Sequence, residues 1–249
     1  PGTRSLRKFL AGTHHVNLSQ ARGAQVLRAK VPDANVGTTH ISTPMRSKRD
    51  TERDRRAKAS IDVIANRIFW EPNFGLGYPV DDAPLIAGIE RYVKPGDDTA
   101  IEVDWDFMGV QYYQRQLVKP WPVPKLRGVP WMSHDFRNYE ITAMGWEVQP
   151  DGLYESLERF HAYGKVPKLV VTENGSAYPD TLVDGRVHDD RRTAFYLAHL
   201  AEVRQAVQDG LPVEGYFCWS LMDNFEWAEG YDPRFGIVHV DFDTQQRTI

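Results

Sequence analysis

Four apolar segments with strand character alternate with segments of helical periodicity, and this order predicts an α/β fold with a parallel sheet. No linker or solenoid-type repeat divides the 249 residues, so we expect one domain over residues 1–249. Four strands are half of the eight that a closed (β/α)8 barrel, or TIM barrel, requires. The sequence therefore predicts a partial TIM barrel.

The first part of the chain is predicted to contain two helices and a strand. Residues 14–30 place small and apolar side chains on one helical face, and Pro32 ends the helix. Residues 35–43 are rich in β-branched residues and indicate a strand. Residues 46–58 hold seven basic and three acidic side chains, which favours the solvated start of an amphipathic helix through residues 61–70 over a nucleic-acid-binding patch.

The remaining elements continue the alternation, separated by loops. Gly and Pro mark residues 71–82 as a loop, and Pro and Trp mark a longer loop over residues 114–150. The predicted helices cover residues 84–93, 152–164 and 189–210, and the predicted strands lie within residues 101–113, 168–174 and 213–223.

Composition excludes several classes of protein. With 41% hydrophobic residues the chain can bury a sizeable core, and its formal net charge of −4 gives no sign of a nucleic-acid partner. The single cysteine, Cys218, cannot form an internal disulfide, which fits a reducing compartment. No apolar run is long enough to span a bilayer and no signal-peptide core is visible, so we expect a cytoplasmic protein without a membrane partner.

Polar and aromatic side chains gather where three predicted strands end, which is where (β/α)8 barrels carry their catalytic groups. These clusters are residues 111–113, 172–175 and 219–227. Glu173 follows the apolar run Leu-Val-Val with only Thr172 in between, and a carboxylate there is costly to bury without a partner. Its position alone is equally compatible with a catalytic role and with capping of the next loop.

Four segments resemble motifs of glycoside hydrolase family 1, the retaining β-glycosidases. TENG (172–175) resembles its nucleophile motif, and WSLMDNFEWAEGYDPRFGIVHVDF (219–242) resembles its eighth-strand segment. DFMGVQYY (106–113) is similar to its sixth-strand motif, and MGWEVQPDGLYESL (144–157) to the segment before its seventh strand. The resemblance covers the whole chain and implies that it supplies barrel strands 5 to 8.

The resemblance implies hydrolysis by two carboxylates, one attacking the anomeric carbon and one protonating the leaving oxygen. It identifies Glu173 with the nucleophile and Tyr113 with the tyrosine that orients it. At position 111 a Gln stands where most members carry Asn. The residues that match substrate-binding positions are Gln111, Trp146, Trp219, Glu226, Trp227 and Phe235.

Some of these residues also have a purely structural explanation. Without the motif, Trp219 and Phe235 would be better explained as core residues. The adjacent acid and indole of Glu226-Trp227 are harder to bury without a ligand, whereas Asp223-Asn224 are expected to hold the loop. No spacing resembles a zinc site, and we expect neither a metal nor another cofactor.

The chain departs from the family in one main respect. The acid/base glutamate of the family belongs to an Asn-Glu-Pro motif on the fourth strand, and this sequence contains no such motif. Glu71-Pro72 follows Trp70 at the end of a predicted helix, so it does not substitute. We expect a part of a longer enzyme that requires the N-terminal half of the barrel, and we expect this chain alone to be poorly stable and weakly active or inactive.

The segment that resembles the eighth-strand motif, residues 219–242, restricts the class of substrate. Glu226 and Trp227 are retained without a nearby Lys, and a carboxylate would repel a sugar phosphate. We therefore expect a β-glycosidase that hydrolyses unphosphorylated, terminal non-reducing β-D-glucosyl residues, with galactosyl and fucosyl residues left open. The alternative is a non-catalytic sugar-binding or structural remnant that lacks the acid/base glutamate.

Overall fold

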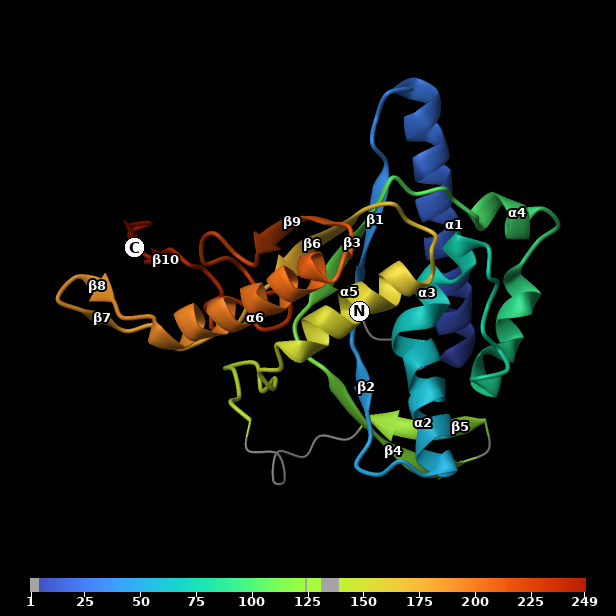
Figure 1. Cartoon of the computed structure of the whole chain (residues 1–249), viewed down its shortest axis with the longest axis horizontal. Coiled ribbons are helices and arrows are strands. Elements are labelled where there is room, and N and C mark those ends of the chain that lie inside the picture. The colour runs from blue at the N-terminus through green and yellow to red at the C-terminus, as the bar shows by residue number, and fades with distance from the viewer. Residues whose placement is uncertain (1–4, 124, 131–138) are drawn as a thin grey trace.

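A four-stranded parallel sheet forms the centre of the computed structural model, which describes residues 5–123, 125–130 and 139–249 (Figure 1). Its strands follow the order β1-β3-β6-β9, so each strand pairs with the next one contributed by a helix crossover. This arrangement confirms the predicted partial barrel. The strands are β1 (Gly37–Ile41), β3 (Phe107–Tyr112), β6 (Leu169–Asn174) and β9 (Val213–Cys218).

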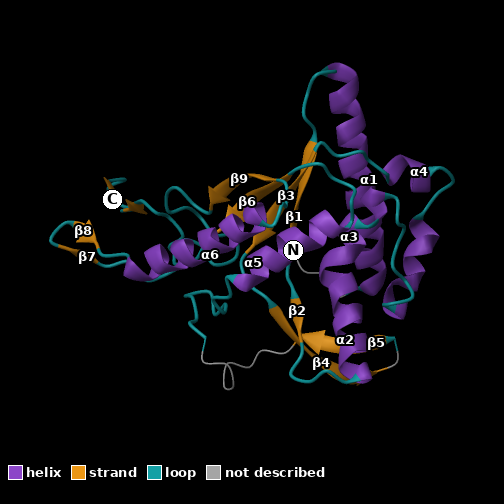
Figure 2. Ribbon diagram, in the orientation of Figure 1, coloured by secondary structure: helices purple, strands orange, loops and turns teal. Residues whose placement is uncertain are grey.

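Helices cover one face of this sheet. Figures 1 and 2 show α5 and α6 side by side, with α1 to α4 around the other end of the sheet. Among the described residues no helix is long and apolar enough to cross a bilayer. The helices are α1 (Leu6–Lys30), α2 (Glu52–Asp62), α3 (Ile68–Trp70), α4 (Asp97–Ile101), α5 (Asp151–Ala162) and α6 (Asp190–Gln208), with a π-helical turn at Val63–Arg67 and 3-10 turns at Pro72–Phe74 and Pro84–Tyr92.

Capping residues explain where the first two helices begin. The Ser5 hydroxyl accepts a hydrogen bond from the backbone N–H of Lys8 at 3.4 Å, so α1 starts eight residues before the predicted residue 14. The Thr51 hydroxyl accepts from the backbone N–H of Asp54 at 3.2 Å and starts α2 inside the predicted basic segment. From there the chain stays helical through the π turn to Trp70, as the apolar pattern predicted.

The predicted long loop over residues 114–150 is wrong in part, because it contains a β-hairpin. Strands β4 (Gln116–Val123) and β5 (Leu126–Pro130) pair antiparallel, and β2 (Met45–Arg46) adds a parallel pair. The hairpin packs against α2 (Figure 2). Val118 is buried there with other apolar side chains. Its prolines concealed these strands in the sequence, and residues 131–138 of the predicted loop lie outside the described residues.

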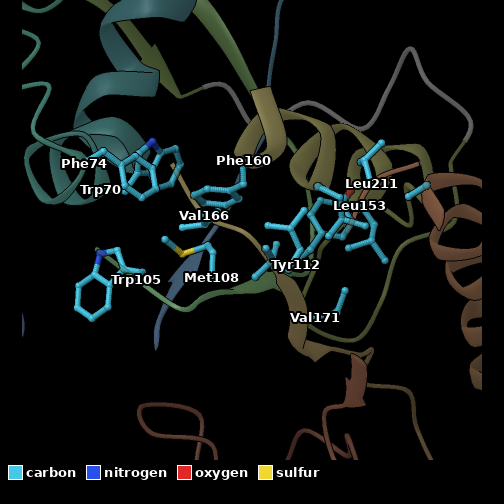
Figure 3. Close-up of a cluster of buried hydrophobic side chains, with 14 of the residues drawn as sticks. Trp70, Phe74, Trp105, Met108, Tyr112, Leu153, Phe160, Val166, Val171 and Leu211 are labelled. Carbon is cyan, nitrogen blue, oxygen red and sulfur yellow. The ribbon is translucent and has the colours of Figure 1, made fainter. Parts of the chain in front are cut away.

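The main core lies between the sheet and α5 (Figure 3). Met108, Val110 and Tyr112 of β3 point into it, where Phe160 and Trp70 meet edge to face at 4.8 Å between ring centroids. The intervening residues of β3 therefore point to the opposite face, which in a closed barrel is the interior. On that face Thr39 and Thr172 form a hydrogen bond of 2.7 Å.

Buried His40 makes the fold acid-sensitive. Burial lowers the pKa of His40 to about 4, and its Nε2 has no hydrogen-bond partner among the described residues. The unfolded chain binds this proton with a pKa of about 6.5, so the stabilisation is complete above that pH and is lost as the pH falls toward 4. We expect the free energy of unfolding to fall by about 2 kcal/mol from pH 7 to pH 5 on account of His40 alone.

Urea titrations at the two pH values measure this effect. His40→Leu removes the titrating group, so the variant should lose about 2 kcal/mol less than the unchanged chain between pH 7 and pH 5. Equal losses in both proteins would contradict the assignment to His40.

Candidate active site

Glu173 lies at the carboxyl end of β6 and both of its oxygens accept hydrogen bonds. Gln111 donates from Nε2 to Oε1 at 2.7 Å, and Tyr113 donates from its hydroxyl to Oε2 at 2.6 Å. Donors on both oxygens stabilise the charged form of a carboxylate and fix its orientation. The longer side chain of Gln111 thus reaches Glu173 directly.

The Tyr113 hydroxyl keeps its proton in this environment. Burial raises the pKa of Tyr113, and its hydrogen bond to Glu173 and the nearby negative charges of Glu173 and Glu226 raise it further. A neutral phenol can only donate to the carboxylate, so the hydrogen bond persists over the whole physiological pH range.

A bulge between β3 and β6 turns Glu173 toward the barrel interior. Val110 pairs with Val171, but the next residue, Gln111, pairs with Glu173, so Thr172 is an extra residue. Strict alternation from buried Val171 would point Glu173 into the helix-covered core. The bulge re-aims it to the same face as Gln111, where the two side chains meet.

A second carboxylate, Glu226, lies in the loop after β9. Trp219 donates from Nε1 to its Oε1 at 3.1 Å, and Asn224 donates from Nδ2 to the same oxygen at 2.9 Å. Asn224 was expected only to hold the loop; it does so through Ser220, at 2.9 Å, but it also fixes a predicted sugar-binding residue. This contact could not be predicted from the sequence because it depends on the fold of the loop.

An aromatic cluster stands next to Glu173. The ring of Tyr113 lies 5.4 Å from Trp146 and 6.2 Å from Phe235, centroid to centroid, and Trp146 and Phe235 are 6.1 Å apart. The structure thus brings together predicted residues from three separate segments. Phe235 is 98% buried in this cluster, and Trp146 is partly exposed beside it.

Trp227 is a predicted site residue that contacts none of the other predicted site residues. Its side chain is 87% exposed, and it makes no hydrogen bond or ring contact with the residues that the structure describes. A large indole left in water is a surface that a ligand or another protein segment can cover.

Other candidate groups have structural partners. Glu71 binds Arg67 Nε at 2.6 Å and accepts from the Tyr163 hydroxyl at 2.7 Å, so it belongs to the outer helices. His14 is buried and contacts Tyr78 at 2.9 Å and Asp97 at 3.1 Å. No group of three or more His, Cys, Asp or Glu side chains within the described ranges is arranged to hold a metal ion.

The motifs and the half barrel agree with a comparison to known families. Residues 1–249 match the model for glycosyl hydrolase family 1 over the whole chain. The chain belongs to this family. Its family 1 relatives include "Beta-glucosidase A" of Thermotoga maritima (36% identical) and the "Bifunctional beta-D-glucosidase/beta-D-fucosidase" of Bifidobacterium breve (35% identical).

The chain spans about half the length of these relatives. The matches cover 100% of this chain and 55% of the Thermotoga protein, and 99% of this chain and 56% of the Bifidobacterium protein. The structural match to the crystal structure of the GH1 beta-glucosidase from Exiguobacterium antarcticum covers 94% of this chain and 53% of the Exiguobacterium chain, with a TM-score of 0.87 and 36% identity. The match to the family 1 b-glucosidase from Thermotoga maritima covers 100% of this chain and 56% of the Thermotoga chain, with a TM-score of 0.90 and 34% identity.

Proposed function

We propose that this chain forms the nucleophile-bearing half of a retaining β-glycosidase that acts on terminal non-reducing β-D-glucosyl residues. The observation that carries the proposal is the Glu173 carboxylate, held by Gln111 and Tyr113 on the interior face of the half barrel. Several family 1 relatives are named as beta-glucosidases and one also as a beta-D-fucosidase, which supports glucosyl substrates and leaves fucosyl ones open. Galactosyl residues stay open as well.

In the proposed reaction Glu173 attacks the anomeric carbon and the glycosidic bond to the leaving oxygen breaks. The products of this step are a glycosyl ester on Glu173 and an alcohol that has taken a proton from the acid/base group. Water then gives its proton back to that group and cleaves the ester, so the sugar leaves with retained configuration. Gln111 and Tyr113 position the attacking oxygens, and Glu226 accepts hydrogen bonds from sugar hydroxyls.

The remaining groups complete the sugar site. We assign Trp219 as the platform beneath the glycone, Phe235 as part of its wall, and Trp227 as a hydrogen-bond donor through its indole N–H. Trp146 would border the entrance for the leaving group. The aromatic contacts of Trp146 and Phe235 with Tyr113 support this arrangement.

We further propose that four strands of an N-terminal half close the barrel on this chain. Strands β1 and β9 each lack a second neighbour within the described sheet, and an open parallel edge is a poor free-standing structure. Phe217 on β9 and Ile41 on β1 are 61% and 49% exposed, so both edges carry apolar side chains that a partner would bury. The family's acid/base glutamate would come from that half, because the sequence here has no Asn-Glu-Pro.

Covalent labelling tests the proposal. A 2-deoxy-2-fluoroglucoside with an activated leaving group needs little acid assistance, so it probes the nucleophile apart from the acid/base group. Mass spectrometry of a peptide digest should find the adduct on Glu173 and none in the Glu173→Gln variant. A folded protein without any adduct would favour the alternative, a sugar-binding or structural remnant.

Tyr113→Phe should slow this labelling by roughly 10- to 100-fold, because it removes a hydrogen bond to a charged carboxylate. Tyr139→Phe, a half-exposed tyrosine outside the aromatic cluster, serves as the matched control and should leave the rate within about two-fold. Equal rates for the two variants would show that Tyr113 does not orient the nucleophile.

Three further expectations from the sequence stay predictions. They are a single domain over residues 1–249, a cytoplasmic location, and the absence of a nucleic-acid partner.

A further inference from the structure

Arg192 is a buried cation in the first turn of α6, away from the groups assigned to the reaction. Its side chain is 3% exposed. It pairs with Asp180 at 3.0 Å, a carboxylate that is itself only 2% exposed, and with Asp189. A buried ion pair of this kind seldom adds net stability compared with apolar packing, so its other contacts are of interest.

The same guanidinium binds two backbone carbonyls that belong to different strand-end loops. Nε donates to the carbonyl oxygen of Ser176 at 3.3 Å, and Nη2 donates to that of Arg234 at 2.8 Å. Ser176 lies three residues after Glu173, and Arg234 directly precedes Phe235. One side chain thus joins the loop of the nucleophile to the loop of the predicted sugar-binding residues.

These loops also touch directly, without spare room. The backbone N–H of Trp219 donates to the carbonyl oxygen of Asn174 at 2.9 Å. A Cβ added to Gly175 would come within 1.8 Å of the carbonyl oxygen of Trp219, so the two backbones meet face to face. A shift of either loop would therefore move the other.

Arg234 carries the connection on to Glu226. Its Nη1 donates to Asp223 Oδ2 at 2.9 Å and to the carbonyl oxygen of Val240 at 2.6 Å. Asp223 is fully buried, accepts the backbone N–H of Gly236 at 3.0 Å, and lies three residues before Glu226. Two guanidinium groups in series therefore span the distance between the Glu173 loop and the Glu226 loop.

We propose that Arg192 is a positioning residue that fixes the Glu173 loop and the Glu226 loop in one relative arrangement, so that nucleophile and sugar-binding carboxylate face the same substrate. This inference rests on the proposed function. A guanidinium suits the task because its planar fork carries five N–H donors, enough for two carbonyls and two carboxylates. The three donors of a Lys ammonium share one atom and cannot reach both loops with the same geometry.

Arg192→Lys tests the inference in the complete native protein. We expect at least about a ten-fold weaker dissociation constant for a gluco-configured piperidine iminosugar and at least about ten-fold slower fluoroglucoside labelling of Glu173, because small misplacements of a site are costly. Arg204→Lys, on the exposed side of the same helix, is the matched control and should equal the unchanged protein. Ile89→Val, in the apolar cluster around α1, controls for lost stability and should bind normally.

Binding is measured by calorimetry well below each variant's melting temperature, so a purely structural role for Arg192 would lower the melting temperature without changing the dissociation constant. That outcome, with Arg192→Lys binding within about two-fold of the unchanged protein, would overturn the inference.

A second variant covers the case in which Arg192→Lys does not fold. Arg192→Gln combined with Asp180→Asn leaves no unpaired buried charge at this pair but loses the reach to both carbonyls. It should show the same weakening, and normal binding by this folded variant would again overturn the inference. If the protein without any substitution neither binds the iminosugar nor takes the label, the proposed function on which the inference rests would be refuted instead.

Discussion

Replacing Glu173 by Ala is expected to lower kcat by roughly 10⁴-fold or more, the largest effect of any single substitution in this chain. Gln111 and Tyr113 both donate to this carboxylate, and the substitution removes the oxygens that they hold in place for the attack on the anomeric carbon. Steady-state hydrolysis of an activated aryl glucoside by the complete native protein measures the loss.

Azide separates a lost nucleophile from a disturbed fold. The Glu173→Ala variant leaves a space on the face from which the carboxylate would attack, and a small anion there can form the new bond itself. Azide should therefore restore turnover and give an α-glycosyl azide, the inverted product of a single displacement. Restored turnover with a β-configured product, or no rescue in a well-folded variant, would contradict the assignment.

The strand order of the half barrel was predictable from the sequence because it depends on local patterns. The apolar runs that end at Tyr112, Asn174 and Cys218 alternate with helical segments, and this alternation alone favours neighbouring parallel strands. The hairpin of β4 and β5 was not predictable in the same way. Pro120 and Pro130 weaken its strand signal, and its stability comes from the burial of Val118 against α2.

The candidate site also has a part that local sequence motifs predict and a part that depends on tertiary structure. Glu173, Tyr113 and Glu226 could be selected from sequence motifs, because each of these motifs is a contiguous segment of the chain. The bulge at Thr172 turns Glu173 inward. It is a property of strand pairing, so no local sequence pattern predicts it. The contacts of Arg192 with the two loops escaped prediction for a similar reason, since they are made to backbone carbonyls that only the folded loops bring near.

Glu226→Gln is expected to lower kcat/KM by about 10²-fold, the second-largest effect, equivalent to about 3 kcal/mol. Both Trp219 and Asn224 donate to Oε1, so the carboxylate is fixed while its second oxygen can accept hydrogen bonds from a sugar. A Gln amide can keep its oxygen toward Trp219 and Asn224 but then presents an NH₂ group to the sugar, which replaces a charged acceptor by a donor.

Glu229→Gln provides the matched control for this prediction, because Glu229 lies in the same turn, is exposed, and has no assigned role. Kinetics with an activated glucoside should show a change of less than about two-fold for Glu229→Gln. A loss shared equally by the two variants would mean that general negative charge in the loop, and not the fixed carboxylate of Glu226, attracts the substrate. A loss confined to Glu226→Gln would tie recognition of the sugar to the Glu226 carboxylate, which Trp219 and Asn224 hold in place.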